Sequence, residues 1–137
     1  MYEKVIDIEA RTLVEMVNTQ VLPGAYEYQS DIAGGFEILG DVSASGKLNL
    51  IPGVIDDRRE MLESLSADIY YVRKNVKEIG ELLEKAERME LEERTAFYFK
   101  VLKPQMAHVR KHVDALEKVM PDTLWQLPKY REMLFIA

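Results

Sequence analysis

Two glycines followed by a lysine form the first segment of the sequence that could do chemistry. The segment reads Gly40-Asp-Val-Ser-Ala-Ser-Gly46-Lys47-Leu48, and glycine-rich loops of this kind can hold phosphate groups on their backbone N–H groups. Five residues separate these glycines, whereas a phosphate-binding loop has four, and Leu48 stands where a magnesium-binding Ser or Thr is needed. The segment therefore predicts a connecting loop rather than a nucleotide site.

Two histidines, His108 and His112, are spaced one helical turn apart and could reach one metal ion from the same helix face. The arginine and lysine that stand between them would repel a cation. A di-metal centre in a helical bundle has a glutamate three residues before each histidine, but here those residues are Gln105 and Val109. The spacing favours two histidines at the edge of an apolar helix face over a metal site.

A run of glutamates at intervals of three could be interpreted as acid/base machinery. General acid/base work needs two carboxylates whose environments in a pocket differ strongly. These glutamates are interleaved with lysine and arginine at distances that suit ion pairs on one helix, so the run predicts a solvated helix face. Its members are Glu78, Glu81, Glu84, Glu87 and Glu90.

The composition excludes several classes of function. Eighteen Lys plus Arg against 24 Asp plus Glu give a net charge of −6, which argues against nucleic acid as a partner. Without a basic groove, the tyrosines and phenylalanines predict helix packing rather than base stacking. The absence of cysteine excludes disulfides, thiolate zinc sites and iron–sulfur clusters. No signal peptide or membrane span is expected, because the sequence has no sufficiently long apolar stretch.

Apolar residues at intervals of three and four predict three long helices in a single domain over residues 1–137. The first is expected at about residues 7–38, with Asp7 as its N-cap and a bend at Pro23. The second is expected at about residues 54–88. The Gly- and Ser-rich stretch 40–53 is expected to form the loop that joins them.

The third helix is expected at about residues 93–120, where the apolar stripe continues in phase across Pro104 and so predicts a kink rather than a break. Residues 87–94 contain no Gly, Pro, Asn or Asp that would force a turn. The chain either turns back there or continues as a single rod of about 100 Å. Kinked helices favour the turn, and thus an all-α, up-and-down antiparallel bundle.

The final segment, residues 121–137, differs in composition from the helices. Two prolines frame the only tryptophan, and the last residues are apolar. Leaving so many large apolar side chains in water is unfavourable, so the segment predicts a tail that docks on the bundle or on a neighbouring subunit. The candidate packing and interface residues are Trp125, Leu127, Tyr130, Leu134 and Phe135.

Three stretches, at residues 8–23, 96–106 and 124–135, link the chain to a known family by their order and spacing. The first runs into Leu-Pro, the second is an aromatic-rich helix with an internal proline, and the third reads Trp-x-x-Pro-x-Tyr-x-x-x-Leu-Phe. With these features the chain resembles the C-terminal helical domain of type III glutamine synthetases, and the resemblance extends from about residue 6 to residue 135.

The resemblance implies a non-catalytic structural or oligomerisation domain of an ATP-dependent glutamate–ammonia ligase in the cytoplasm. The implied partners are the rest of the parent enzyme and the neighbouring subunits of a homo-oligomer. ATP and divalent metal are implied for the parent's catalytic region, and nothing in these 137 residues matches its metal-ligating or nucleotide-contacting residues. We therefore expect no enzyme activity and no catalytic, cofactor-binding or metal site in this chain alone.

Two other functions remain open from the residues themselves. A free-standing helical bundle could capture a partner helix in a groove as a protein-interaction module. A metal-dependent helical enzyme would have to rely on the two histidines alone. The reading frame upstream of Met1 distinguishes the first of these from a domain of a longer protein.

Overall fold

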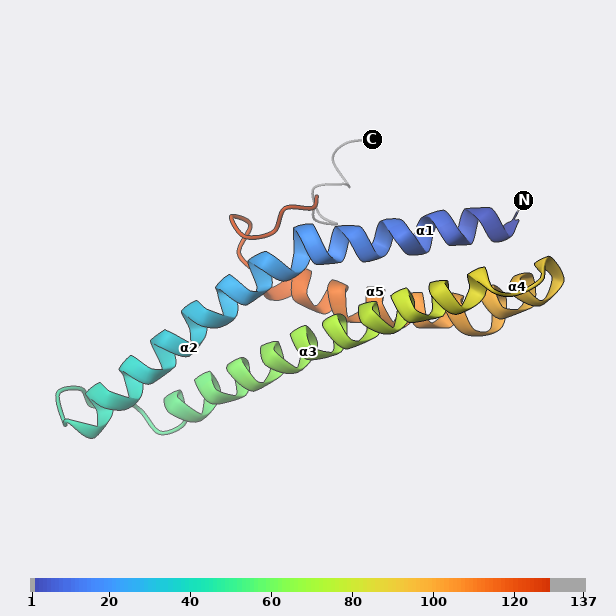
Figure 1. The fold of residues 1–137 in the computed structure, drawn as a ribbon. Coiled ribbons are helices and arrows are strands. Elements are labelled where there is room, and N and C mark those ends of the chain that lie inside the picture. The colour runs from blue at the N-terminus through green and yellow to red at the C-terminus, as the bar shows by residue number, and fades with distance from the viewer. Residues whose placement is uncertain (1, 129–137) are drawn as a thin grey trace.

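The computed structural model describes residues 2–128, and every regular element within them is a helix (Figure 1). The all-α class predicted from the apolar spacing is thus confirmed for this part of the chain. The elements form three helical stretches. They are α1 (Tyr2–Met16), a π-helical turn (Val17–Val21) and α2 (Leu22–Ala44); α3 (Val54–Glu87); and α4 (Leu91–Phe97), a second π-helical turn (Tyr98–Leu102) and α5 (Lys103–Val119).

The first helical stretch is longer than its sequence pattern predicts. It begins at Tyr2 rather than near residue 7, so Asp7 lies inside α1 and is not its N-cap. It also continues to Ala44 rather than to about residue 38. Glycines lower helix propensity without preventing a helix, and Leu39 and Val42 beyond them are half-buried, so packing extends α2.

The connecting loop is correspondingly shorter and covers only residues 45–53. Gly46 has a φ of 75° and Gly53 a φ of 96°, in the left-handed region where a side chain would be strained. Gly53 directly precedes α3, which occupies almost the predicted range. The two glycines therefore let the chain reverse between α2 and α3.

Each proline inside a helical stretch follows a π-helical turn. Before Pro23, the Leu22 N–H donates to the carbonyl of Val17, five residues earlier. Before Pro104, the Lys103 N–H donates to the carbonyl of Tyr98 in the same way. A proline ring collides with the carbonyl four residues earlier in a regular helix, and the wider π turn removes that collision. Figure 1 shows the change of direction where α1 meets α2.

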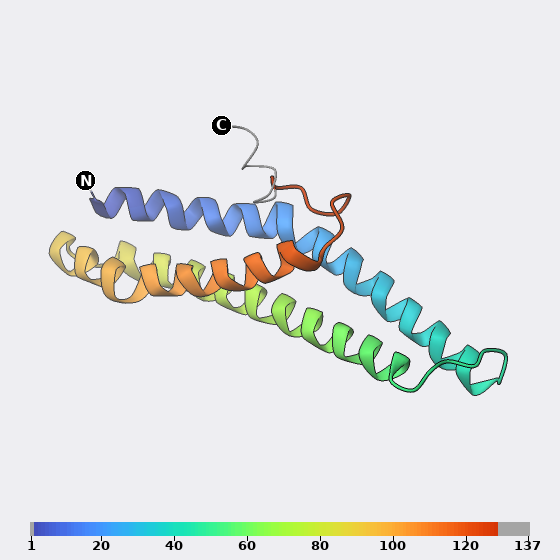
Figure 2. The same ribbon diagram turned by 180° about the vertical axis from the view of Figure 1, so that it is seen from behind.

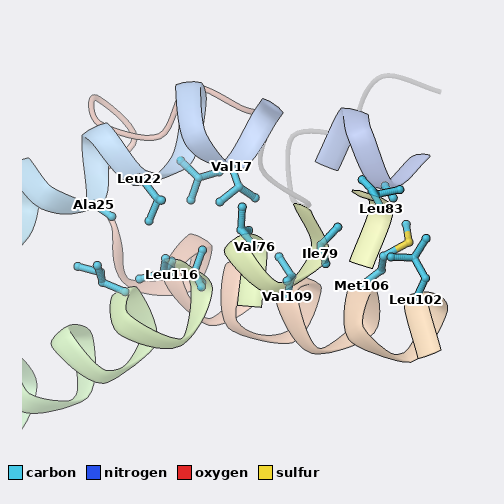
Figure 3. Packing of buried hydrophobic residues seen from close by; sticks show 14 of the residues in the cluster. Val17, Leu22, Ala25, Val76, Ile79, Leu83, Leu102, Met106, Val109 and Leu116 are labelled. Carbon is cyan, nitrogen blue, oxygen red and sulfur yellow. The ribbon is translucent and has the colours of Figure 1, made fainter. Parts of the chain in front are cut away.

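One hydrophobic core joins the three stretches (Figure 3). Val17, Val76 and Val109 come from different stretches and are at most 3% exposed. The side chains that are almost completely buried have the same mixed origin. They are Ile79, Leu102, Leu116, Val17, Val21, Val72 and Val109.

The chain reverses again between α3 and α4, so residues 87–94 contain a turn and not a continuous rod. Figure 2 shows α5 lying along α3, with the start of α1 at the same end of the molecule as this turn. Beyond the other end of α5, α2 and the first half of α3 continue as a two-helix arm that ends in loop 45–53 (Figures 1 and 2). No helix among residues 2–128 has the length and apolar character needed to cross a lipid bilayer.

Candidate functional site

The turn between α3 and α4 is held by the side chain of Arg94. Its Nε donates to the carbonyl oxygen of Ala86 at 3.0 Å, and its Nη2 donates to that of Met89 at 2.9 Å. Ala86 lies in the last turn of α3, where carbonyls lack intrahelical partners, and Met89 lies in the turn that follows, so the guanidinium joins the end of α3 to the turn. Arg94 thereby supplies the stop signal that no glycine or proline supplies here.

Arg94 also links the turn to the start of α1. Its Nη1 donates to Oε1 of Glu3 at 3.4 Å. Glu3 is only 8% exposed, and burying a carboxylate is costly unless it has a charged or hydrogen-bonding partner. The pair therefore ties the first turn of α1 to the end of α3.

Asp7, one turn further along α1, binds two partners. Its Oδ1 accepts a hydrogen bond from the Tyr98 hydroxyl at 3.0 Å, and its Oδ2 accepts one from Nε of Arg11 at 3.0 Å. Nη2 of Arg11 then donates to Oε1 of Glu87 at the end of α3, at 2.9 Å. Asp7, which the sequence pattern presents as an N-cap, instead connects α1 to the second π turn.

Burial and the hydrogen bond to Asp7 raise the pKa of Tyr98 to about 12. The tyrosine is 2% exposed, so its phenolate would lose solvation, and it would also face the Asp7 carboxylate. Tyr98 is therefore a neutral hydrogen-bond donor at physiological pH.

We name these linked side chains the turn cluster. Each carboxylate in it binds an arginine, and Arg11 is shared by Asp7 and Glu87, so three carboxylates face two guanidinium groups. All of its members except Arg11 line an open depression of about 370 Å³, together with Lys4 and Ile8. What this arrangement does is hold α1 and both sides of the α3–α4 turn in one orientation. Its members are Glu3, Asp7, Arg11, Glu87, Arg94 and Tyr98.

The two histidines take different positions. His112 lies between α5 and α3, with Nδ1 3.0 Å from Oδ1 of Asp68. Its ring stacks on Tyr71 at a centroid distance of 5.3 Å and an interplanar angle of 23°. His108 is exposed. Among residues 2–128 no group of three or more His, Asp or Glu side chains is arranged to hold a metal ion.

The glutamate run does not act as one group. Glu78 is half-buried and its Oε2 accepts a hydrogen bond from Nε2 of Gln105 on α5 at 2.6 Å, while Glu87 belongs to the turn cluster. The other three glutamates of the run are exposed, as expected for a solvated face. In the Gly40–Leu48 segment, the first residues lie in the last turn of α2, so the connecting loop begins later than predicted.

The tail residues that the structure describes dock on their own chain. Trp125 is 6% exposed and belongs to the core, and Leu127 packs against that core. The carbonyl oxygen of Leu124 lies directly against Gly24, where a Cβ atom would collide with it. Trp125 Nε1 is buried without an acceptor among residues 2–128. Tyr130, Leu134 and Phe135 lie outside the described residues and stay predictions.

Sequence reasoning identified Trp125 but missed both Gly24 and Arg94. A glycine directly after a proline inside a helical pattern is a signal for close backbone approach, and it would have indicated Gly24. Nothing local distinguishes Arg94 from the other basic residues of the sequence, because its partners are carbonyls at the end of α3 and a carboxylate on α1.

A family match at the start of the chain and three relatives aligned over nearly its whole length all concern glutamine synthetases. Residues 1–39 match the family described as "Glutamine synthetase C-terminal domain". The chain is 27% identical over 135 residues to a glutamine synthetase of Bacteroides fragilis and 32% identical over 138 residues to the type-3 glutamine synthetase of Dictyostelium discoideum. A glutamine synthetase of Butyrivibrio fibrisolvens is 29% identical over 136 residues. These alignments cover 98% to 99% of the chain and 18% of each relative, so the chain spans about a fifth of their length.

Proposed function

Because this chain resembles the C-terminal domain of type III glutamine synthetases over nearly its whole length, we propose that it is the structural and oligomerisation domain of such an enzyme. In this proposal the parent is a cytoplasmic, ATP-dependent glutamate–ammonia ligase, and the chain contributes packing rather than chemistry. Its partners are the rest of the enzyme and the neighbouring subunits of a homo-oligomer.

The ATP and divalent metal of the parent enzyme belong, in this proposal, to its catalytic region. The described residues of this chain do not fit either group. His112 is engaged with Asp68 and Tyr71, whereas His108 is exposed, and Gly40 lies in a helix rather than in a phosphate-binding loop. No chemical step is therefore assigned to this chain.

The observation that carries the proposal is the bond between Glu3 and Arg94. It fixes the first turn of α1 to the α3–α4 turn through a nearly buried charge pair. In a C-terminal domain the polypeptide enters at the first helix, so this link would orient the domain relative to what precedes it. We further infer an up-and-down antiparallel bundle, bent at Pro23 and Pro104, that acts as a rigid unit.

The test uses the complete gene product that contains these residues. Removing residues 2–128 should reduce the number of subunits in the assembly, obtained by analytical ultracentrifugation as the mass of the assembly divided by the mass of the shortened subunit. Arg94→Met should weaken assembly in the same direction, and Arg88→Met, which changes an exposed arginine next to the turn, should not. An unchanged number of subunits after the deletion, or glutamine formation by this chain alone, would refute the proposal.

A second candidate is the free-standing helical module that binds a partner helix. The open groove between α1 and α3, lined by Val14, Val76 and Gly80, favours it. Sequencing the messenger RNA separates the two functions, since a module is translated without a ligase region and a domain is translated with one.

A further inference from the structure

An open groove runs between α1 and α3. It consists of two depressions, of about 550 Å³ and about 360 Å³, that share Val14 and Gly80 in their walls. Val76 lines the larger depression and Leu83 the smaller one, so the floor is apolar along its length. Val76 is 3% exposed and Leu83 4%, so both are already out of water, and an occupant gains apolar contact mainly with the half-buried Val14 and with the rim.

The two ends of this groove carry opposite charge. The larger depression is lined by Arg73, Lys74 and Lys77 and contains no carboxylate in its walls. The smaller one is lined by Glu15 and Glu84, together with an arginine that already binds two carboxylates of the turn cluster. An occupant of uniform charge would therefore meet repulsion at one end.

On one face of α3 the charged side chains are basic before Gly80 and acidic after it. Tyr70, Arg73, Lys77, Gly80 and Glu84 follow at intervals of three and four, which places them on one face of the helix. Two copies of α3 that lie antiparallel, with a two-fold axis next to Gly80, set Lys77 of each copy opposite Glu84 of the other. Within the described residues neither Lys77 nor Glu84 makes an ion pair, so both are available for this contact.

Gly80 removes the steric obstacle to this pairing. It has no side chain, and nothing lies within 4 Å of the position where a Cβ atom would stand. Two helices can therefore approach closely at the axis itself. At the rim, Tyr70 is 58% exposed, and tyrosine is a residue type enriched in protein interfaces.

We propose that the α1–α3 groove is a self-association surface that binds a second copy of this chain, antiparallel and two-fold symmetric about Gly80. The inference rests on the proposed function and deepens it, because it names the surface through which neighbouring subunits meet. The opposite charges of the groove ends set the antiparallel direction, and the exposed Tyr70 ring and the half-buried Val14 supply apolar area that association buries.

Sedimentation velocity of the 137-residue chain tests the proposal. We expect a reversible dimer whose dissociation constant rises about tenfold or more between low and high salt, since exposed charge pairs are screened. Lys77→Glu or Glu84→Lys alone places like charges opposite each other twice and should raise the dissociation constant at least about tenfold. The double variant Lys77→Glu/Glu84→Lys restores opposite charges across the axis and should restore the dimer.

The controls separate the surface from general effects of charge. Lys118→Glu reverses an exposed lysine on α5 and should leave the dissociation constant unchanged. Circular dichroism should show equal helix content in all variants. A chain that stays monomeric, or a double variant that fails to recover, overturns the proposal. A dimer whose dissociation constant is unchanged by both single reversals also refutes the groove as the association surface. The oligomerisation role itself is tested separately, by the deletion in the complete gene product.

Discussion

Gly24 and Leu124 are far apart in the sequence and in direct contact in the fold. The Leu124 carbonyl oxygen lies against the backbone of α2 in the space that any side chain at position 24 would occupy. Because of this contact, Trp125 reaches the core and the chain after α5 lies on α2. A glycine thus determines where the tail docks.

The same substitution should have opposite effects at two glycines. Gly24→Ala forces the Leu124 backbone away and should destabilise the fold by about 1 to 3 kcal/mol, the usual range for overpacking. Within its own chain Gly80→Ala meets open space, so it should stabilise α3 of the monomer by about 0.5 to 1 kcal/mol, since alanine is the better helix former. Urea unfolding followed by circular dichroism measures both. A Gly24→Ala variant as stable as the parent sequence would show that the tail does not dock as described.

Removing the Arg94 guanidinium should cost more stability than removing any exposed arginine nearby. Arg94→Met leaves Glu3 buried without its partner and uncaps two carbonyls, so we expect a loss of about 2 to 4 kcal/mol. Arg88→Met is the matched control, with an expected change within about 0.5 kcal/mol. The double variant Glu3→Gln/Arg94→Met should lose less than the sum of the two single losses, because both act on one interaction. Equal stability of the Arg94 and Arg88 variants would contradict the role given to Arg94.

Stability should fall at alkaline pH because of Tyr98. Its pKa of about 12 in the folded chain lies above the value of about 10 of an unfolded tyrosine, so the folded state keeps its proton longer. The stabilisation is present below pH of about 10 and is lost as the pH rises to about 12, with a slope of about 1.4 kcal/mol per pH unit. In Tyr98→Phe the free energy of unfolding should not show this loss between pH of about 10 and about 12. The measurement is the difference between the free energies of unfolding of the parent sequence and the variant as the pH rises. Identical curves over that pH range would refute the buried bond to Asp7.

Trp125 should report on docking of the tail by its own fluorescence. As the only tryptophan, buried to 6% exposure, it should emit at short wavelength and resist quenching by iodide. Trp125→Ala should cost about 3 to 5 kcal/mol, as for other emptied aromatic sites. Because Nε1 has no acceptor among the described residues, Trp125→Phe should lose only packing and cost less. Emission at the long wavelength of a water-exposed tryptophan would contradict docking of Trp125 on the chain's own core.

Removing residues 129–137 tests the remaining tail prediction. The three predicted packing residues there are Tyr130, Leu134 and Phe135. If they pack on this chain, the shortened chain unfolds at lower urea concentration; if they pack on a neighbouring subunit, only the assembly of the complete gene product weakens. A truncation that changes neither stability nor assembly would refute a packing role for these residues.

Local sequence pattern predicted α3 best and the ends of the first helix worst. The apolar spacing that predicts this helix continues without interruption, so the range 54–88 differs from Val54–Glu87 by a single residue. Asp7 has the side chain of a good N-cap, but its partners are Tyr98 and Arg11, and one of these lies 91 residues away. Helix ends that depend on such distant contacts leave no local signal.

The same reason explains the turn after α3. Its stop signal is a guanidinium that binds carbonyls five and eight residues earlier and a carboxylate 91 residues earlier. The sequence pattern of residues 87–94 was compatible with a turn or with a continuous helical rod. Only the proline kinks predicted in the other helices favoured the turn. The position of a candidate residue could be predicted where burial alone determines it, as for Trp125. It could not be predicted where charge pairs between distant parts of the sequence determine it.

The length of the two-helix arm makes the position of its tip sensitive to small changes of angle at the first π turn. The 23 residues of α2 extend about 34 Å from Val21 to the loop, at 1.5 Å per residue. A tilt of about 5° at the π turn therefore displaces the tip of the arm by about 3 Å, the length of a hydrogen bond. Gln29 and Ser66, bonded at 2.9 Å, and Arg59, 5.7 Å from the Phe36 ring centre, couple α3 to that movement. Small adjustments beside the core are thus amplified at a site remote from it.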